Sequence, residues 1–178
     1  MTKFMNSRGI AIVGILAITA FGLANSATAS QKSIQIVMKS NVEKLTFTGI
    51  TVEGKNFKST MLLGKKPSVL WFWAPWCAIC KNESHFIVAA AKKYKNKVNF
   101  IGVGALGSAA EMQEFVSQTG ANSFLNLNDE STKVWSRFGV FIQPTLVFVD
   151  TKGRISSKVG PSGAAFLEKK LKSLFISQ

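Results

Sequence analysis

The chain has 178 residues, with 22 lysines and arginines against 9 acidic residues and a formal net charge of +13 at pH 7. That length suits one domain with a substantial core and is short for two. The chain has two cysteines, too few for a fold that relies on disulfide bridges, so we expect them to be present for chemistry.

The first 29 residues have the pattern of a secretory signal peptide. Lys3 and Arg8 precede an apolar run over residues 9–23, and Ala27-Thr28-Ala29 supplies the small residues of a cleavage site. We therefore expect cleavage after Ala29 and a location outside the cytoplasm, in the cell envelope or secreted. The run is short for a membrane-spanning helix, and an uncleaved N-terminal anchor is the alternative.

Removal of residues 1–29 would take away two positive charges and lower the net charge from +13 to +11. The lysines are spread along the chain, which is typical of a solvated basic surface. For an exported protein, anionic cell-wall polymer or lipid headgroups are the next partner to consider. No recognised nucleic-acid-binding motif accompanies the charge, so we expect no nucleic-acid partner.

Residues 30–42 are polar and mixed, and we expect an extended or poorly ordered lead-in to one domain over residues 43–178. The domain begins with apolar residues on either side of Glu53-Gly54-Lys55, a pattern that predicts a β-hairpin.

A buried strand then leads into a helix. The run Val69 to Trp73 is short and apolar throughout, which indicates a strand covered on both faces. Ala74-Pro75 breaks this run. A helix is expected from Cys77 to about Lys93, with an apolar stripe that begins at Ile79.

Both cysteines lie at the start of this helix. Cys77 is at the N-terminus, where unpaired backbone N–H groups and the helix dipole stabilise a thiolate. The thiolate is the form that attacks disulfides. Cys80 follows about one turn later, so it can close an intramolecular disulfide and release whatever was bound to Cys77. The pair is therefore predicted to be a redox switch.

Other uses of two cysteines fit less well. A structural disulfide that closes so short a loop stabilises the fold by only about 2 kcal/mol. A zinc site needs four ligands as a rule, and only His85 joins the cysteines. Covalent haem attachment needs a histidine directly after the second cysteine, where Lys81 stands. We therefore expect no metal and no organic cofactor.

The segment Trp71-Phe72-Trp73-Ala74-Pro75-Trp76-Cys77-Ala78-Ile79-Cys80-Lys81 resembles the active-site motif of the thioredoxin-like proteins. The Pro-Trp before the cysteines is similar to their extracytoplasmic branch, the DsbE, TlpA and ResA group with a thioredoxin domain of the AhpC/TSA-Redoxin type. The resemblance covers roughly residues 43–176. It implies a thioredoxin-like α/β fold, a three-layer sandwich in which helices cover both faces of a mixed sheet that begins with a β-hairpin.

The remaining chain alternates strands and helices and ends in a hairpin and a helix, which argues for parallel first strands with helices on the faces of the sheet. Ser108 and Glu111 form the pattern of a capping box at the start of one helix. The expected elements are a strand at 98–103, a helix at 108–119, a strand at 124–127, a helix at 131–138, a hairpin at 145–159 and a C-terminal amphipathic helix.

The loop over residues 138–145 resembles the thioredoxin-family loop in which the proline peptide bond is cis and faces the two cysteines. By that resemblance, Pro144 is cis and the backbone of Gln143 is free to pair with an extended substrate segment beside the sulfurs. Trp76 would cover the site. Taken alone, the Pro-Thr pair would suggest an ordinary trans-proline turn before a strand.

One departure from the family concerns the proton at Cys80. Typical thioredoxins carry a buried acid where this chain has Trp71, yet Cys80 must be deprotonated in an apolar setting that opposes the thiolate. Glu83 matches the acid after the second cysteine in the extracytoplasmic branch, so it is the candidate proton relay. The alternative is a surface acid favoured by the helix dipole. His85 is expected to be exposed.

The segment Gly102-Val103-Gly104-Ala105-Leu106-Gly107 matches the G-x-G-x-x-G pattern of dinucleotide sites, and Asp129 follows 22 residues later. Ser108 already caps a helix directly after the third glycine, and the remaining chain is short for a dinucleotide fold. We therefore expect a glycine-rich loop here.

The resemblance implies a thiol-disulfide oxidoreductase that acts on exported proteins with thiols or disulfides, together with a membrane or extracytoplasmic redox partner. Trp71 in place of the acid weakens the case for a reductant, so an oxidant or an isomerase is favoured, with the oxidant as the leading interpretation. The first alternative is a reductant of exported proteins, as in cytochrome c maturation. An alternative of another class is a cationic secreted binding module whose disulfide is only structural.

Overall fold

The computed structural model describes the backbone of residues 21–176 and the side chains of residues 30–175. The chain divides between Gln35 and Ile36 into two compact units, and all the described strands belong to the second.

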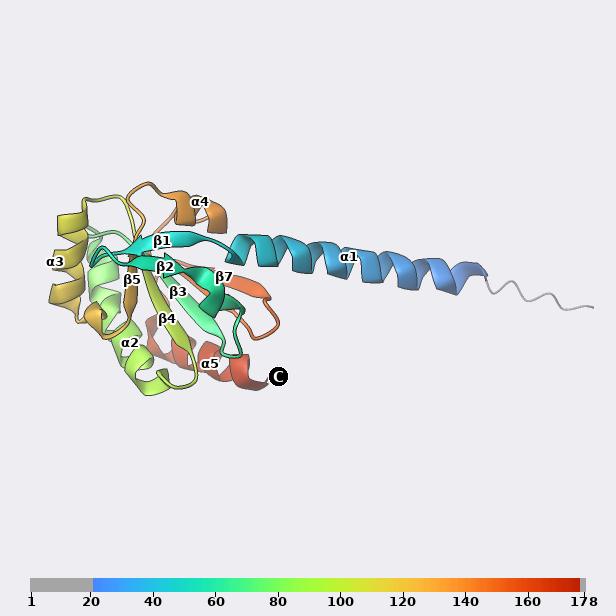
Figure 1. Ribbon diagram of the computed structural model, residues 1–178. Helices are drawn as coiled ribbons and strands as arrows, with labels where there is room; N and C mark the ends of the chain where they lie inside the picture. The colour runs from blue at the N-terminus through green and yellow to red at the C-terminus, as the bar shows by residue number, and fades with distance from the viewer. Residues whose placement is uncertain (1–20, 177–178) are drawn as a thin grey trace, which may run out of the picture. The chain divides into compact units, whose positions relative to one another are not determined.

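The strands of the described residues form one mixed sheet of seven strands in the order β2-β1-β5-β4-β3-β6-β7 (Figure 1). The central strands β3, β4 and β5 run parallel to one another, and the remaining neighbours pair antiparallel. The predicted mixed sheet with an N-terminal hairpin is therefore confirmed. The strands are β1 Thr48–Thr51, β2 Asn56–Lys58, β3 Ser68–Trp73, β4 Asn99–Gly104, β5 Leu125–Asn128, β6 Thr145–Val149 and β7 Ile155–Val159.

Helices cover both faces of this sheet, as predicted. The α-helices are α1 Phe21–Leu45, α2 Ala78–Tyr94, α3 Ala109–Thr119, α4 Lys133–Phe138 and α5 Gly163–Ile176, and the short 3₁₀ helices are η1 Ser59–Leu63 and η2 Ala121–Ser123. Within the described residues, the buried apolar side chains form one cluster on each face. Trp71 and Trp73 of β3 pack with α2, α3 and α5, whereas Phe72 packs with α4 on the other face. Because alternate residues of a strand point to opposite faces, a strand buried on both must be apolar throughout.

Helix α1 runs through residues 30–42, where the sequence suggested an extended lead-in. That expectation was wrong, since no glycine or proline interrupts the helix between residues 30 and 45. The predicted signal peptide lies mostly outside the described residues and stays a prediction. Among the helices that the structure describes, none has both the length and the apolar character needed to span a membrane.

Two of the three glycines of the G-x-G-x-x-G pattern, Gly102 and Gly104, make room for the side chain of Trp73. Gly102 and Gly104 lie inside β4. The strand predicted over residues 98–103 already included Gly102, and the predicted glycine-rich loop is wrong at Gly104. A Cβ atom at Gly104 would lie 2.8 Å from two ring atoms of Trp73, and one at Gly102 would collide with Asn126. Trp73 in turn stacks on Phe115, with 4.3 Å between the ring centroids. The pattern therefore has a structural cause that needs no bound nucleotide.

Candidate active site

The two cysteines form a disulfide where β3 passes into α2. Cys77 is the N-cap of α2, and its Sγ accepts a hydrogen bond of 3.1 Å from the backbone N–H of Cys80. The turn before it is closed by a bond of 3.1 Å from the N–H of Cys77 to the carbonyl oxygen of Ala74. Placement of Cys77 at a helix N-terminus follows the prediction and favours negative charge on its sulfur.

The two sulfurs differ in their access to solvent. Cys80 is fully buried, whereas 6% of Cys77 is exposed at the surface. An incoming thiolate therefore has access to Cys77 and not to Cys80. This asymmetry fits an attacking residue and a resolving residue.

Trp76 lies beside the disulfide with 63% of its surface exposed. Its indole N–H donates a hydrogen bond of 2.7 Å to the carbonyl oxygen of Leu106, in the loop after β4. Leu106 has a φ of +61°, a conformation that few residues other than glycine adopt. The loop therefore fixes the ring next to Cys77 while its apolar face stays open to solvent.

The peptide bond between Gln143 and Pro144 is cis, which confirms the prediction. Thr145 pairs with Phe72 across β6 and β3. Pro144, one residue earlier, therefore lies near the end of β3 that leads into the cysteine turn. The backbone of Gln143 forms no hydrogen bond with the rest of the described chain, so it can pair with a bound peptide.

Exposed apolar side chains lie next to both sequence motifs, in segments from separate parts of the chain. Phe141 is 85% exposed and Ile142 is 60% exposed, directly before the cis-proline. Ile79 on α2 and Leu106 are also exposed, so the expected apolar stripe on α2 was wrong at Ile79. Phe141, Ile142 and Leu106 were not predicted from the sequence as site residues. The available signal was the position of large apolar residues in loops next to both motifs.

Glu83 is buried, with 4% of its surface exposed, so the alternative of a surface acid is wrong. It lies on the inner face of α2, one turn beyond Cys80. Its Oε1 accepts hydrogen bonds from the backbone N–H of Ser162, at 2.6 Å, and from the hydroxyl of the same residue. Oε2 has no hydrogen-bond partner in the described part of the chain. A buried carboxylate oxygen without a partner is a candidate proton acceptor.

Trp71 is fully buried and packs against Trp73 and Phe115. An indole cannot take up a proton from Cys80, so the site lacks an acid at this position, as the sequence indicated. His85 is exposed on α2, as expected. Among the described residues, no three histidine, cysteine or acidic side chains gather closely enough to hold a metal ion.

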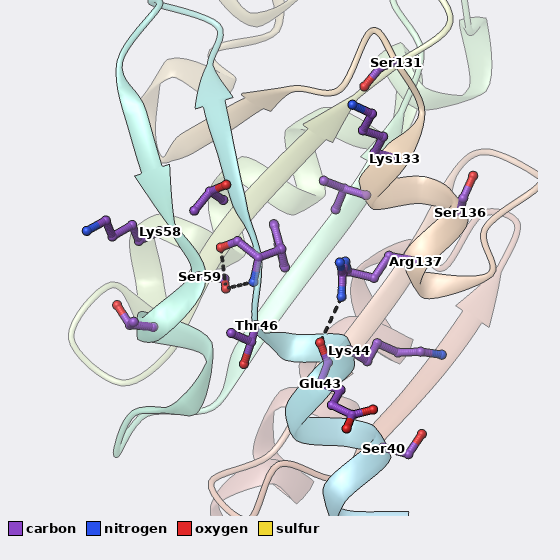
Figure 2. A pocket seen from close by; sticks show the side chains of 14 residues that line it. Ser40, Glu43, Lys44, Thr46, Lys58, Ser59, Ser131, Lys133, Ser136 and Arg137 are labelled. Atoms are coloured by element: carbon purple, nitrogen blue, oxygen red, sulfur yellow. Dashed lines mark hydrogen bonds between the residues drawn. The ribbon is translucent and has the colours of Figure 1, made fainter.

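A hollow of about 1080 Å³ lies apart from these groups, bounded by the end of α1, η1 and α4. Its lining includes Lys44, Lys58, Lys133 and Arg137 but neither cysteine nor Pro144. In Figure 2 the side chains of Lys44 and Lys58 point outward on opposite sides of the hollow. Arg137 donates to the backbone carbonyl of Glu43 at 2.9 Å. Lys44 and Lys58 therefore do not converge on one point, and the hollow is separate from the disulfide.

A mixed sheet with helices on both faces, a disulfide at a helix N-terminus and a cis-proline on the neighbouring strand define a thioredoxin-like thiol-disulfide oxidoreductase. The chain belongs to the AhpC/TSA family, whose sequence model matches residues 38–158.

Comparison with known proteins agrees with this assignment. The chain is 37% identical over 158 residues to the soluble secreted antigen MPT53 of Mycobacterium tuberculosis, which covers 88% of this chain and 83% of that protein. It is also 26% identical over 102 residues to the thiol:disulfide interchange protein DsbE of Yersinia pestis, covering 57% of this chain and 53% of that protein.

Solved structures show the same fold. MTB DsbF, determined in mixed oxidized and reduced forms, matches with a TM-score of 0.71 and 37% identity over 74% of this chain and 96% of that one. A secreted Mycobacterium tuberculosis disulfide oxidoreductase homologous to E. coli DsbE matches with a TM-score of 0.66 and 34% identity, over 75% of this chain and 98% of that one.

Proposed function

We propose that the protein exchanges its Cys77–Cys80 disulfide with the cysteines of exported proteins and that it acts as an oxidant. The observation that carries the proposal is the pairing of an accessible sulfur at a helix N-terminus with a buried one. The disulfide itself accepts the two electrons, so no metal or organic cofactor takes part.

The exchange proceeds in two balanced steps. A substrate thiolate attacks Sγ of Cys77, a bond forms between these sulfurs, and the Cys77–Cys80 bond breaks with its electron pair on Cys80, which then takes up a proton. A second substrate thiolate attacks the substrate sulfur of this mixed disulfide and releases Cys77 as a thiolate. The substrate dithiol is oxidised to a disulfide and the protein is reduced to a dithiol.

The environment of Cys77 supports the proposed direction. The N–H of Cys80 and the start of α2 favour the Cys77 thiolate. A stabilised reduced form makes a dithiol pair a stronger oxidant. Re-oxidation then requires a membrane or extracytoplasmic redox partner.

One observation favours the second candidate, a reductant of exported proteins. Glu83 is buried one turn from Cys80 and has an oxygen without a partner. Such a carboxylate can take the Cys80 proton when that sulfur attacks the mixed disulfide, which is the step a reductant must complete.

The substrate would bind as an extended segment across the cis-proline loop. The backbone of Gln143 offers the hydrogen bonds, and Trp76, Phe141 and Ile142 offer apolar contacts on either side of the sulfurs. This arrangement suits a partly unfolded protein with apolar residues near its cysteine.

Export is supported by the signal-peptide pattern of residues 1–29 and by the similarity to a secreted antigen. The net charge would favour a place near anionic wall polymer or lipid headgroups.

A redox titration of the full-length protein, followed by tryptophan fluorescence, tests the proposal. It should be paired with assays of insulin reduction and of oxidative refolding of a reduced protein. We expect a potential more oxidising than that of thioredoxin, faster refolding, and loss of both activities in Cys77→Ser. A reduced Cys77 that labels with a thiol reagent no faster than an ordinary cysteine at neutral pH would indicate a binding module with a structural disulfide.

A further inference from the structure

Ser162, in the loop between β7 and α5, holds the buried carboxylate of Glu83 from one side. Its backbone N–H donates a hydrogen bond of 2.6 Å to Oε1, and its hydroxyl donates to the same oxygen. Oε2 is buried but has no hydrogen-bond partner within the described residues. One carboxylate oxygen is therefore fixed, and the other is left as an acceptor.

Cys80 and Glu83 share the buried face of α2. Side chains three residues apart on a helix are neighbours, so the free oxygen and the Cys80 sulfur belong to the same turn. Lys81, between them in sequence, is exposed and donates to Gln118. In the part of the chain that the structure describes, no charged side chain forms an ion pair with Glu83. Glu83 and Cys80 are therefore the two acidic groups on the buried side of this turn.

The same loop also reaches the cis-proline. The backbone N–H of Gly160 donates a hydrogen bond of 2.8 Å to the carbonyl oxygen of Pro144. Gly160 and Gly163, on either side of Ser162, have φ angles of +78° and +68°, which glycine adopts without steric cost. Residues 160–163 therefore connect the peptide-binding loop to the acid behind Cys80.

We propose that Ser162 is a positioning residue for proton transfer at Cys80, an inference that rests on the exchange function proposed above. When a substrate thiolate attacks Cys77, the departing Cys80 sulfur takes the proton from Oε2 of Glu83 in its carboxylic acid form, which leaves Glu83 as a carboxylate. In the reverse direction, the Cys80 thiol gives its proton to Oε2 as its sulfur attacks Cys77 and displaces the substrate sulfur. By holding Oε1, Ser162 keeps Oε2 available for the proton.

The test follows the resolving step in the reduced full-length protein with an aromatic disulfide that releases a coloured thiolate. Attack by Cys77 releases the first thiolate, and attack by Cys80 on the mixed disulfide releases the second. We expect Ser162→Ala to slow the second release about tenfold, the size expected when a hydrogen bond to a charged group is lost, and to change its pH profile. The first release should be unchanged, and Ser162→Thr should restore the second.

If Ser162 acts by positioning Glu83, the effect of Ser162→Ala must depend on Glu83, whereas a general loss of packing would not. In Glu83→Gln, the second release should already be slow, and the added Ser162→Ala substitution should have no further effect. Ser84→Ala is the matched control, because Ser84 is also buried on α2 but its hydroxyl donates to the carbonyl oxygen of Lys81 at 2.7 Å. Both releases should be unchanged in this control.

Circular dichroism checks that each variant is folded. If Ser162→Ala does not fold, the isosteric pair Ser162→Thr and Ser162→Val gives the same comparison with and without the hydroxyl. The inference is overturned if the second release in the variants without the hydroxyl is as fast as in the wild type. It is also overturned if loss of the hydroxyl slows the second release by the same factor in the Glu83→Gln background as in the wild-type background. A wild-type protein that releases no second thiolate would instead overturn the exchange function itself.

Discussion

The indole ring of Trp73 lies so close to Gly104 that a Cβ atom at that glycine would be 2.8 Å from the ring. Trp73 is the last residue of β3 and Gly104 is the last residue of β4, directly across the parallel pair. The ends of β3 and β4, next to the cysteine turn, can therefore pack closely only if the large side chain of Trp73 faces a residue without a side chain at position 104.

The first prediction concerns this pair. Gly104→Ala should lower the free energy of unfolding by about 1–3 kcal/mol, since overpacking forces the ring or the backbone to move. Urea unfolding followed by tryptophan fluorescence measures the change. Gly49→Ala is the control, because a Cβ atom at Gly49 would meet nothing within 4 Å. Equal effects of the two substitutions would contradict the packing argument.

The second prediction concerns the order of the two sulfurs. The reduced Cys80→Ser protein should keep a mixed disulfide between Cys77 and a substrate cysteine, because the residue that displaces the substrate has been removed. Mass spectrometry under non-reducing conditions detects the adduct. Cys77→Ser should form none, since Cys80 is fully buried. An adduct of comparable yield on Cys80 would reverse the assigned roles.

A third prediction addresses substrate binding. Phe141→Ser should raise KM for a peptide with apolar residues beside its cysteine by about tenfold, because a Phe side chain gains more than 1.4 kcal/mol when it is buried. Exchange with glutathione, which has no large apolar side chain to pack on Phe141, should be unaffected. Steady-state kinetics with both substrates measures the difference.

Leu63→Ser serves as the control for that experiment. Leu63 is also exposed, but it precedes β3 in the chain and lies toward the opposite end of that strand from the cysteine turn. A rise in KM of the same size for Leu63→Ser would show that general surface hydrophobicity, and not the cis-proline loop, governs binding.

A fourth prediction concerns acid stability. Hydrogen bonds from Lys93 and Tyr94 lower the pKa of Glu168 to about 2, against 4.5 without these partners. A pKa that is lower in the folded state stabilises the fold above the unfolded value and loses that contribution as the pH falls through the folded one. The contribution of Glu168 should therefore disappear between about pH 5 and pH 2.

Thermal unfolding across this range, with Glu168→Gln beside the wild type, measures that loss. The variant should have a smaller drop in Tm between pH 5 and pH 2 than the wild type has. Glu53→Gln, at an exposed position of the hairpin turn, should follow the wild type. A drop in Glu168→Gln as large as that of the wild type would show that this ion pair does not contribute.

The predicted lead-in over residues 30–42 is a helix in the structure, for a reason that lies in the local sequence. Residues 30–42 are polar and mixed, which suggested an extended segment, but a helix tolerates such a composition where glycine and proline are absent. The capping box at Ser108 and Glu111 was correctly recognised, because it depends on residues only three positions apart.

The G-x-G-x-x-G segment shows where a local pattern misleads. Its glycines match a nucleotide-binding loop in spacing, yet two of them lie in β4 and make room for Trp73 and Asn126. Trp73 belongs to the neighbouring strand and lies far from Gly104 in the sequence, so the local pattern around Gly104 does not include it. Spacing along the chain therefore could not reveal the cause.

The cis form of Pro144 followed from the resemblance to the thioredoxin-like proteins. By itself, the sequence determined the strands of the sheet, the α-helices after residue 77 and the place of Cys77 at a helix N-terminus. These features depend on periodicity and on residues a few positions apart, which local physical chemistry controls. Only the tertiary structure decided that Glu83 is buried and that Ser162, 79 residues later, holds one of its oxygens. The burial and the hydrogen bonds of a side chain depend on the segments packed against it, and folding brings those together from distant parts of the chain.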